Sequence, residues 1–199
     1  MDIYPRFSFY SRRYGFIPIK TFKSIQFIDG NKPLVICDID HTFIRCSQNL
    51  EHYRQILYKD FENSRGAIRY RMTHDDNKKA LQFLMQSYNL GFMKQTDPSG
   101  FNDMITKIEN LGGKLVFLTS RGILSHQKTI EDLKKVGLED PEKYDIHYTN
   151  SQMSKGEYIR QTNLIDGYQH ISFIDDYVPF LESVKEIYPH INCYLFQCY

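Results

Sequence analysis

The chain has 199 residues and a formal net charge of +1. This length allows one domain with a sizeable core, and the near-neutral charge gives no general argument for binding nucleic acid or a membrane. No stretch reaches membrane-spanning length, and residues 1–16 lack the apolar core of a secretion signal. The cysteines show no paired metal-ligand spacing, so we expect free thiols in a reducing compartment and a cytoplasmic protein.

Residues 1–30 form an aromatic and basic arm that carries no acid between Asp2 and Asp29. Its basic residues are Arg6, Arg12, Arg13, Lys20 and Lys23. We expect the arm to pack its aromatic side chains on the domain and to leave its charges in solvent. The alternative is an arm that binds anions.

Residues 34–37, Leu-Val-Ile-Cys, form a continuous apolar run that predicts a strand buried on both faces of a parallel sheet. Asp38 therefore lies at the carboxyl end of the strand, where open α/β sheets bind ligands. If the chain leaves extended geometry at Ile39, Asp38 and Asp40 both face this crevice. Two nearby acids repel each other, and a divalent cation is the usual remedy. A turn rich in aspartate is the alternative interpretation.

Residues 46–99 are the candidate cap, an insertion after the first strand. Apolar residues at helical spacing predict two amphipathic helices, over residues 50–61 and 81–88. Between them, Arg69 and Arg71 alternate with apolar residues as in a strand. These arginines either bind a second phosphate, a carboxylate or a nucleotide, or lie on the solvated face of an edge strand. We expect Asp-Pro-Ser-Gly, residues 97–100, to be the linker back to the core.

From Phe101 onward, helical and strand patterns alternate. Helices are predicted over residues 104–111, 124–136, 155–164 and 178–187, and strands over residues 114–119, 144–148, 171–175 and 191–196. Strands separated by helix-length segments are typical of an α/β protein with a doubly wound parallel sheet and right-handed crossovers. The core domain is therefore expected to comprise residues 31–45 and 100–199.

Three later segments carry residues that suit phosphoryl chemistry. Thr119 and Ser120 end the second predicted strand, where hydroxyl and backbone N–H groups bind phosphate oxygens. Lys155 begins a helix and offers a fixed positive charge, and Asp175 and Asp176 end another strand and suit a hard cation. Each segment also has an ordinary interpretation as a helix cap, a solvated charge or a surface turn. The order of all four segments along the chain favours the functional interpretation.

Taken together, these segments resemble the haloacid dehalogenase-like phosphatase superfamily. The resemblance covers most of the chain and is carried by Asp38, Asp40, Thr42, Thr119, Lys155, Asp175 and Asp176. It implies a Rossmann-like doubly wound parallel sheet with a small, mainly helical cap inserted after the first strand. It also implies that the cap sets substrate specificity.

The resemblance further implies a role for each matching residue. Asp38 is the nucleophile that takes the phosphoryl group as an aspartyl phosphate. Asp40 protonates the leaving oxygen and later deprotonates the attacking water. Thr119 binds the transferring phosphoryl group, and Lys155 neutralises charge on it and on Asp38.

Mg²⁺ is the implied cofactor. The expected ligands are the carboxylate of Asp38, the backbone carbonyl of Asp40 and Asp175, with support from Asp176. The candidate substrate-binding residues are Thr42, Ser120, Arg121, Arg69 and Arg71. Arg121 either binds the substrate or pairs with an acid at the start of a helix.

His41 is a departure from the superfamily pattern, because its position is often glycine. Its side chain either points to solvent or lines the entrance and contacts substrate. The departure removes no catalytic group. The presence of Asp40 disfavours dehalogenase activity, because in this superfamily that residue separates phosphatases and phosphotransferases from enzymes that act on carbon–halogen bonds.

We therefore expect a magnesium-dependent phosphomonoester hydrolase that acts on a small phosphorylated substrate. One alternative is a non-catalytic module that keeps the fold and binds an anionic partner. Another is a nucleotide or polynucleotide phosphatase, to which the near-neutral charge gives little support. Neither the substrate nor the oligomeric state follows from the sequence.

Overall fold

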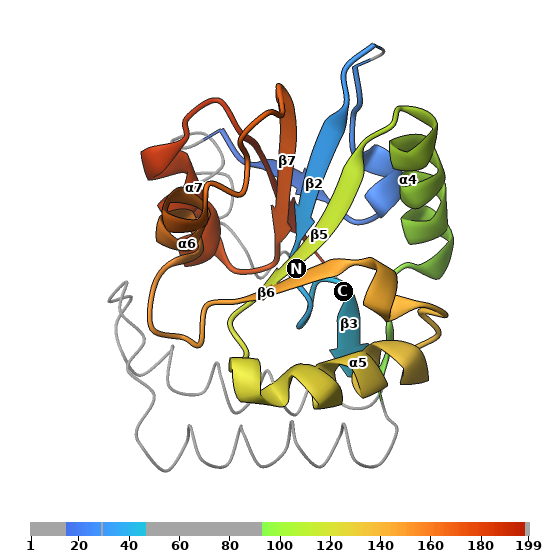
Figure 1. Cartoon of the computed structure of the whole chain (residues 1–199). Coiled ribbons are helices and arrows are strands. Elements are labelled where there is room, and N and C mark those ends of the chain that lie inside the picture. The colour runs from blue at the N-terminus through green and yellow to red at the C-terminus, as the bar shows by residue number, and fades with distance from the viewer. Residues whose placement is uncertain (1–14, 29, 47–92, 198–199) are drawn as a thin grey trace, which may run out of the picture.

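The computed structural model describes residues 15–28, 30–46 and 93–197 of the chain. Within these residues, six parallel strands form one sheet in the order β1-β8-β7-β2-β5-β6 (Figure 1). In that order the strands are Ile17–Ile19, Asn192–Phe196, His170–Asp175, Pro33–Cys37, Lys114–Thr119 and Asp145–Tyr148. The α-helices of the described residues are α4 (Pro98–Asn110), α5 (His126–Lys135), α6 (Lys155–Thr162) and α7 (Val178–Ile187).

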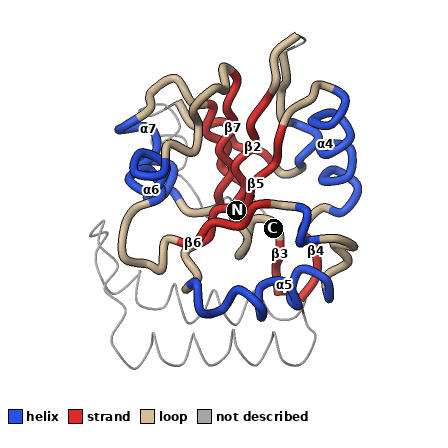
Figure 2. Tube along the Cα trace, in the orientation of Figure 1, coloured by secondary structure: helices blue, strands red, loops and turns tan. Residues whose placement is uncertain are grey.

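Helices cover both faces of the sheet, with α6 and α7 on one side and α4 on the other (Figures 1 and 2). Alternate residues of β2 enter two separate hydrophobic clusters: Val35 and Cys37 join the side chains of α4 and α5, and Leu34 and Ile36 join those of α6 and α7. Burial of each such side chain stabilises the fold by about 1.5–3 kcal/mol. The predicted doubly wound parallel sheet, with β2 buried on both faces, is confirmed.

Strand β1 is an element that the sequence patterns did not predict. It lies inside the expected arm and pairs in parallel with β8 at the edge of the sheet. Pro18 stands at its centre, and proline is tolerated only where one side of a strand needs no partner. Phe16 and Phe22, on either side of β1, are buried. The described part of the arm therefore packs its aromatic residues on the domain, as expected.

A two-stranded antiparallel ribbon brackets the candidate cap. Its strands are β3 (Ile44–Cys46) and β4 (Met93–Gln95). Residues 47–92 lie between them and outside the described residues, so the two helices expected there, together with Arg69 and Arg71, stay predictions. None of the helices in the described part of the chain is long and apolar enough to cross a membrane.

The prediction of a linker at residues 97–100 is wrong, because helix α4 begins at Pro98. The carboxylate of Asp97 caps the helix by accepting a hydrogen bond from the Gly100 backbone N–H at 3.0 Å. Asp, Pro, Ser and Gly are turn residues, but aspartate followed by proline is equally the pattern of a helix N-terminus. In this chain these residues form the N-terminus of helix α4.

Candidate active site

The carboxyl ends of three neighbouring strands form the candidate site. Strand β2 lies between β5 and β7, and the chain crosses first to β5 and later to β7. Such a reversal of direction opens a crevice at the strand ends, where α/β sheets bind ligands. Asp38, Thr119 and Asp175 stand at these three ends, so the fold places residues from distant parts of the chain together.

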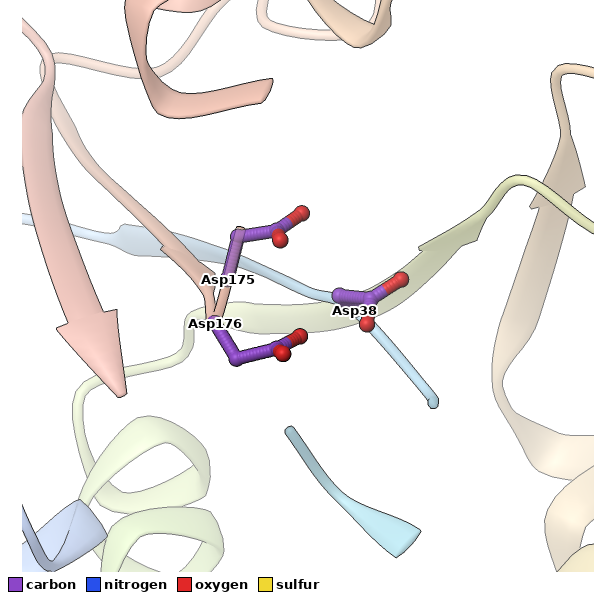
Figure 3. Close-up of side chains that lie close together, drawn as sticks. All are labelled: Asp38, Asp175 and Asp176. Atoms are coloured by element: carbon purple, nitrogen blue, oxygen red, sulfur yellow. The ribbon is translucent and has the colours of Figure 1, made fainter. Parts of the chain in front are cut away.

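Asp38, Asp175 and Asp176 form an acid cluster (Figure 3). One carboxylate oxygen from each residue lies within 4.8 Å of the others. Burial raises the pKa of Asp38 to about 7, that of Asp175 to about 6 and that of Asp176 to about 8. The neighbouring carboxylates contribute to this rise in pKa, and Lys155 opposes it. Full ionisation of the cluster is therefore disfavoured until further positive charge is supplied.

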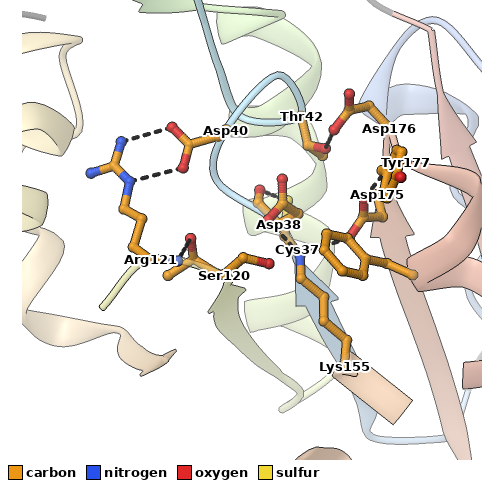
Figure 4. Close-up of polar contacts among 12 residues, drawn as sticks. Cys37, Asp38, Asp40, Thr42, Ser120, Arg121, Lys155, Asp175, Asp176 and Tyr177 are labelled. Carbon is orange, nitrogen blue, oxygen red and sulfur yellow. Dashed lines mark hydrogen bonds and ion pairs between the residues drawn. The ribbon is translucent and has the colours of Figure 1, made fainter. Parts of the chain in front are cut away.

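Lys155 supplies one such charge from the first position of α6. Its side chain is completely buried, and its Nζ donates to Asp38 Oδ1 at 2.5 Å and to Asp175 Oδ2 at 2.7 Å (Figure 4). The same Nζ lies 4.8 Å from the ring centre of Phe180, a cation–π contact. Burial by itself lowers the pKa of Lys155, but the charges of Asp175 and Asp38 outweigh it and raise the net pKa.

Close packing of α6 on α7 fixes the position of Lys155. A Cβ atom on Gly156 would lie 2.0 Å from the backbone oxygen of Ser183, so only glycine fits between the helices. The Gly156 N–H also donates to Ser183 Oγ at 3.1 Å. At the start of α6, Ser154 Oγ accepts from the Glu157 N–H at 3.2 Å and caps the helix.

His41 lies in the turn that follows Asp38. Its φ angle is +65°, in the left-handed region that favours glycine. The turn closes through a bond from the His41 N–H to the Ile44 carbonyl at 2.6 Å. Thr42, which is fully buried in this turn, donates from its hydroxyl to Asp176 Oδ1 at 3.2 Å. Thr42 therefore links the turn after Asp38 to Asp176 of the acid cluster.

Asp40 lies apart from the acid cluster and pairs with Arg121. Two guanidinium nitrogens, Nε and Nη2, donate to its two carboxylate oxygens, each at 2.8 Å. Nη1 of Arg121 donates to Thr129 Oγ1 and Asp132 Oδ2 of α5, each at 3.2 Å. In Figure 4 the Asp40 carboxylate faces Arg121 and points away from Asp38. Of the two expectations for Arg121, pairing with acids is observed, although Asp132 lies in the second turn of the helix.

Hydroxyl groups lie at the carboxyl end of β5. Thr119 is buried, and its Oγ1 accepts from the Arg121 backbone N–H at 3.2 Å. The Oγ atom of Ser120 is also buried, and it has no hydrogen-bond partner among the described residues. A buried hydroxyl without a partner is costly. The site therefore offers a donor that an anionic oxygen would satisfy.

The acid cluster fits a hard divalent cation. Carboxylate oxygens are the ligands that Mg²⁺ prefers, whereas the sulfur and imidazole ligands that favour zinc are absent from the cluster. Lys155 alone balances only part of the charge that three carboxylates would carry. A cation bound to Asp38, Asp175 and Asp176 would supply the rest.

The structure brings most of the sequence-predicted site residues to one end of the sheet. Asp38, Lys155 and Asp175 are in direct contact, and the others line the same edge: Thr42, Thr119, Ser120 and Asp176, with Asp40 and Arg121 beside them. Sequence reasoning missed Thr129 and Asp132. A polar or charged residue in an amphipathic helix is ordinarily assigned to its solvated face, so the sequence holds no signal for these two.

Comparisons with known proteins agree with this fold. A family model described as "Protein of unknown function (DUF2608)" matches residues 19–146, more than half of the chain. Among solved structures, a Thermotoga maritima protein described as a proposed β-phosphoglucomutase is similar over 82% of this chain and 84% of that one, with a TM-score of 0.50 and 15% sequence identity. No curated protein matches the sequence. At this identity the likeness concerns the fold alone.

Proposed function

The chain belongs to the DUF2608 family of proteins of unknown function, and we propose that it is a phosphomonoester hydrolase of the haloacid dehalogenase type. The proposal rests mainly on one observation. A buried lysine at the start of α6 bridges the carboxylates at the ends of β2 and β7, with the Asp176 carboxylate in the same cluster. A buried cation set among acids at a ligand-binding crevice suits a reaction that transfers a dianionic phosphoryl group.

Asp38 is the proposed nucleophile. An oxygen of its carboxylate attacks phosphorus, the bond from phosphorus to the ester oxygen breaks, and an aspartyl phosphate forms. Lys155 holds the other carboxylate oxygen and reduces the repulsion between Asp38 and the incoming anion. Water then attacks the aspartyl phosphate, releases inorganic phosphate and restores the carboxylate.

Asp40 is the proposed acid and base. It gives a proton to the departing ester oxygen and takes one from the water that attacks in the second step. In an in-line displacement the leaving oxygen lies on the far side of phosphorus from Asp38. A carboxylate that points away from Asp38 and lies outside the acid cluster suits that place.

Three groups are proposed to bind the transferring phosphoryl group. Thr119 and Ser120 offer hydroxyl groups at the end of β5, and the buried Ser120 Oγ lacks a partner among the described residues. Lys155 offers the positive charge. Donors held in place before the reaction stabilise charge in the transition state better than water does.

Mg²⁺ is the proposed cofactor, held by the carboxylates of Asp38, Asp175 and Asp176. When bound, it would neutralise charge on the phosphoryl oxygens and on the attacking carboxylate. Thr42 keeps Asp176 directed into the cluster through its hydroxyl. The raised pKa values suit a site in which all three carboxyl groups ionise only when a cation binds.

The test is a screen of the purified full chain against a panel of phosphate monoesters, with Mg²⁺ and with a chelator. Hydrolysis is expected only with the metal. Asp38→Asn should abolish it, whereas the matched control Asp145→Asn, which loses only an exposed pair with Lys114, should keep the wild-type rate. Acid-quenched wild-type protein should carry a phosphoryl group that hydroxylamine removes, and the Asp38→Asn protein should carry none.

An undiminished rate in the Asp38→Asn protein would overturn the proposal. Magnesium binding without turnover of any ester would favour the non-catalytic module instead. The nucleotide phosphatase alternative depends on Arg69, Arg71 and the first residues of the arm, all outside the described residues. A strong preference for nucleotides in the same screen would support it.

A further inference from the structure

Asp132 is a buried acid that the proposed reaction does not use. It is 3% exposed and lies on α5, away from the acid cluster. Its Oδ2 accepts from Arg121 Nη1 at 3.2 Å, and its Oδ1 accepts from Lys128 Nζ at 2.8 Å. Beside it, the buried Thr129 accepts from the same Nη1. Burial of a carboxylate is costly unless cations hold it, so this arrangement requires Arg121 to stay in place.

Arg121 connects α5 to Asp40 in the turn after β2. Its Nη1 faces Thr129 and Asp132, while Nε and Nη2 form the two-bond pair with Asp40. These contacts use donors on all three nitrogens of the guanidinium. Because the group is planar and rigid, fixing it on α5 also fixes the direction in which it presents the pair to Asp40.

We propose that Arg121 is a positioning residue that sets the orientation of Asp40, and that Asp132 and Thr129 hold Arg121 for this purpose. The inference rests on the proposed function, because it concerns the residue proposed as acid and base. The side chain of Asp40 is 33% exposed, and the two-bond pair with Arg121 restricts the orientation of its carboxylate. Arg121 acts through Asp40 and does not bind the substrate phosphate.

The test compares two substrates that differ in their need for an acid. An alkyl phosphate has a leaving group that requires protonation, whereas the leaving group of 2,4-dinitrophenyl phosphate departs without it. Replacement of a general acid typically costs roughly 10²–10⁴-fold. We expect Arg121→Gln to lower kcat/KM for the alkyl ester by about 10²-fold or more and for the dinitrophenyl ester by far less. Asp40→Asn should show the same pattern, and the double variant should be no worse than Asp40→Asn alone.

Asp132→Asn separates positioning from substrate binding, because a residue this buried does not touch the ester. It should reproduce the same leaving-group dependence with a smaller loss. The control is Arg160→Gln, which removes an arginine from an exposed pair with Glu157. It should leave kcat/KM for both esters unchanged. An equal loss on both esters in Arg121→Gln, with weaker inhibition by inorganic phosphate, would show that Arg121 binds the phosphate and would overturn the proposal.

A second measurement keeps this inference separate from the proposed function. Urea unfolding of wild type, Arg121→Gln, Asp40→Asn and the double variant gives a double-mutant cycle that needs no activity. We expect the two destabilisations to be non-additive. If the wild-type protein hydrolyses no ester, the proposed function fails but a non-additive cycle still supports the pair, whereas additive losses overturn the role of Arg121.

Discussion

The Nζ atom of Lys155 lies 2.5 Å from Oδ1 of Asp38, although 117 positions separate the two residues in the chain. The contact exists because β2 and α6 both deliver their ends to the same edge of the sheet. Each partner depends on the other, because a buried lysine without acids, or ionised buried acids without the lysine, would be strongly unfavourable.

Lys155→Met is therefore predicted to destabilise the protein and to abolish hydrolysis. Removal of one partner from a buried ion pair costs about 3–5 kcal/mol. The matched control is Lys114→Met, whose pair with Asp145 is exposed and should contribute less than about 1 kcal/mol. Urea unfolding at pH 8 without metal measures both. Equal stability of the two variants would contradict the buried pair.

The acid cluster predicts that stability falls as the pH rises. Burial raises the pKa of Asp38 to about 7, that of Asp175 to about 6 and that of Asp176 to about 8, above the ordinary value of 3.8. The folded protein therefore binds more protons than the unfolded chain between roughly pH 4 and pH 8, so the free energy of unfolding decreases through this window. The raised pKa of Lys155 matters only near and above its ordinary value of 10.5.

Mg²⁺ should reverse this dependence, because it competes with those protons. In chelator, Tm should be lower at pH 8 than at pH 5.5, and the gain in Tm on adding Mg²⁺ should be larger at pH 8. Asp175→Asn should flatten both trends. Thermal unfolding scans test this prediction, which a Tm that rises steadily with pH in chelator would refute.

Gly156→Ala sets two effects of opposite sign against each other. Alanine in place of glycine favours a helix by about 1 kcal/mol, but its Cβ would meet the Ser183 backbone oxygen at 2.0 Å. Because that atom belongs to the backbone of α7, we expect a net loss of about 1–3 kcal/mol and lower activity through displacement of Lys155. Gly122→Ala, whose nearest contact is at 3.8 Å, should leave stability nearly unchanged in the same unfolding assay. A Gly156→Ala protein as stable as wild type would show that α6 and α7 can separate.

The centre of the sheet could be predicted from the sequence because its strands are fully buried. Apolar runs in β2, β5 and β7, the last interrupted by Ser172, show where each strand ends, and the polar residue that follows is then expected at the ligand-binding end of the sheet. The same reasoning placed Asp38, Thr119 and Asp175 at the same end of the sheet. That β2, β5 and β7 are neighbours follows from the strand order, which the apolar runs do not give.

Strand β1 and the partners of Arg121 could not be predicted in this way. Strand β1 has three residues with Pro18 at its centre, too few for a periodic pattern. Asp132 follows Lys128 by four positions, a spacing typical of a solvent-exposed helix pair. It is buried because Arg121 reaches it from the loop after β5, and such a tertiary contact leaves no local signal.

His41→Gly is predicted to stabilise the protein by about 0.5–1 kcal/mol, because His41 holds a left-handed conformation with a φ of +65° that glycine adopts without strain. Asn163→Gly is a matched variant, since Asn163 has a φ of +51° at the end of α6. Urea unfolding and kcat/KM separate the two expectations for His41. Equal stabilisation with unchanged activity means that His41 points to solvent, whereas a lower kcat/KM in His41→Gly alone means that its side chain contacts substrate. A loss of stability in His41→Gly would show that the imidazole contributes more than the backbone strain costs.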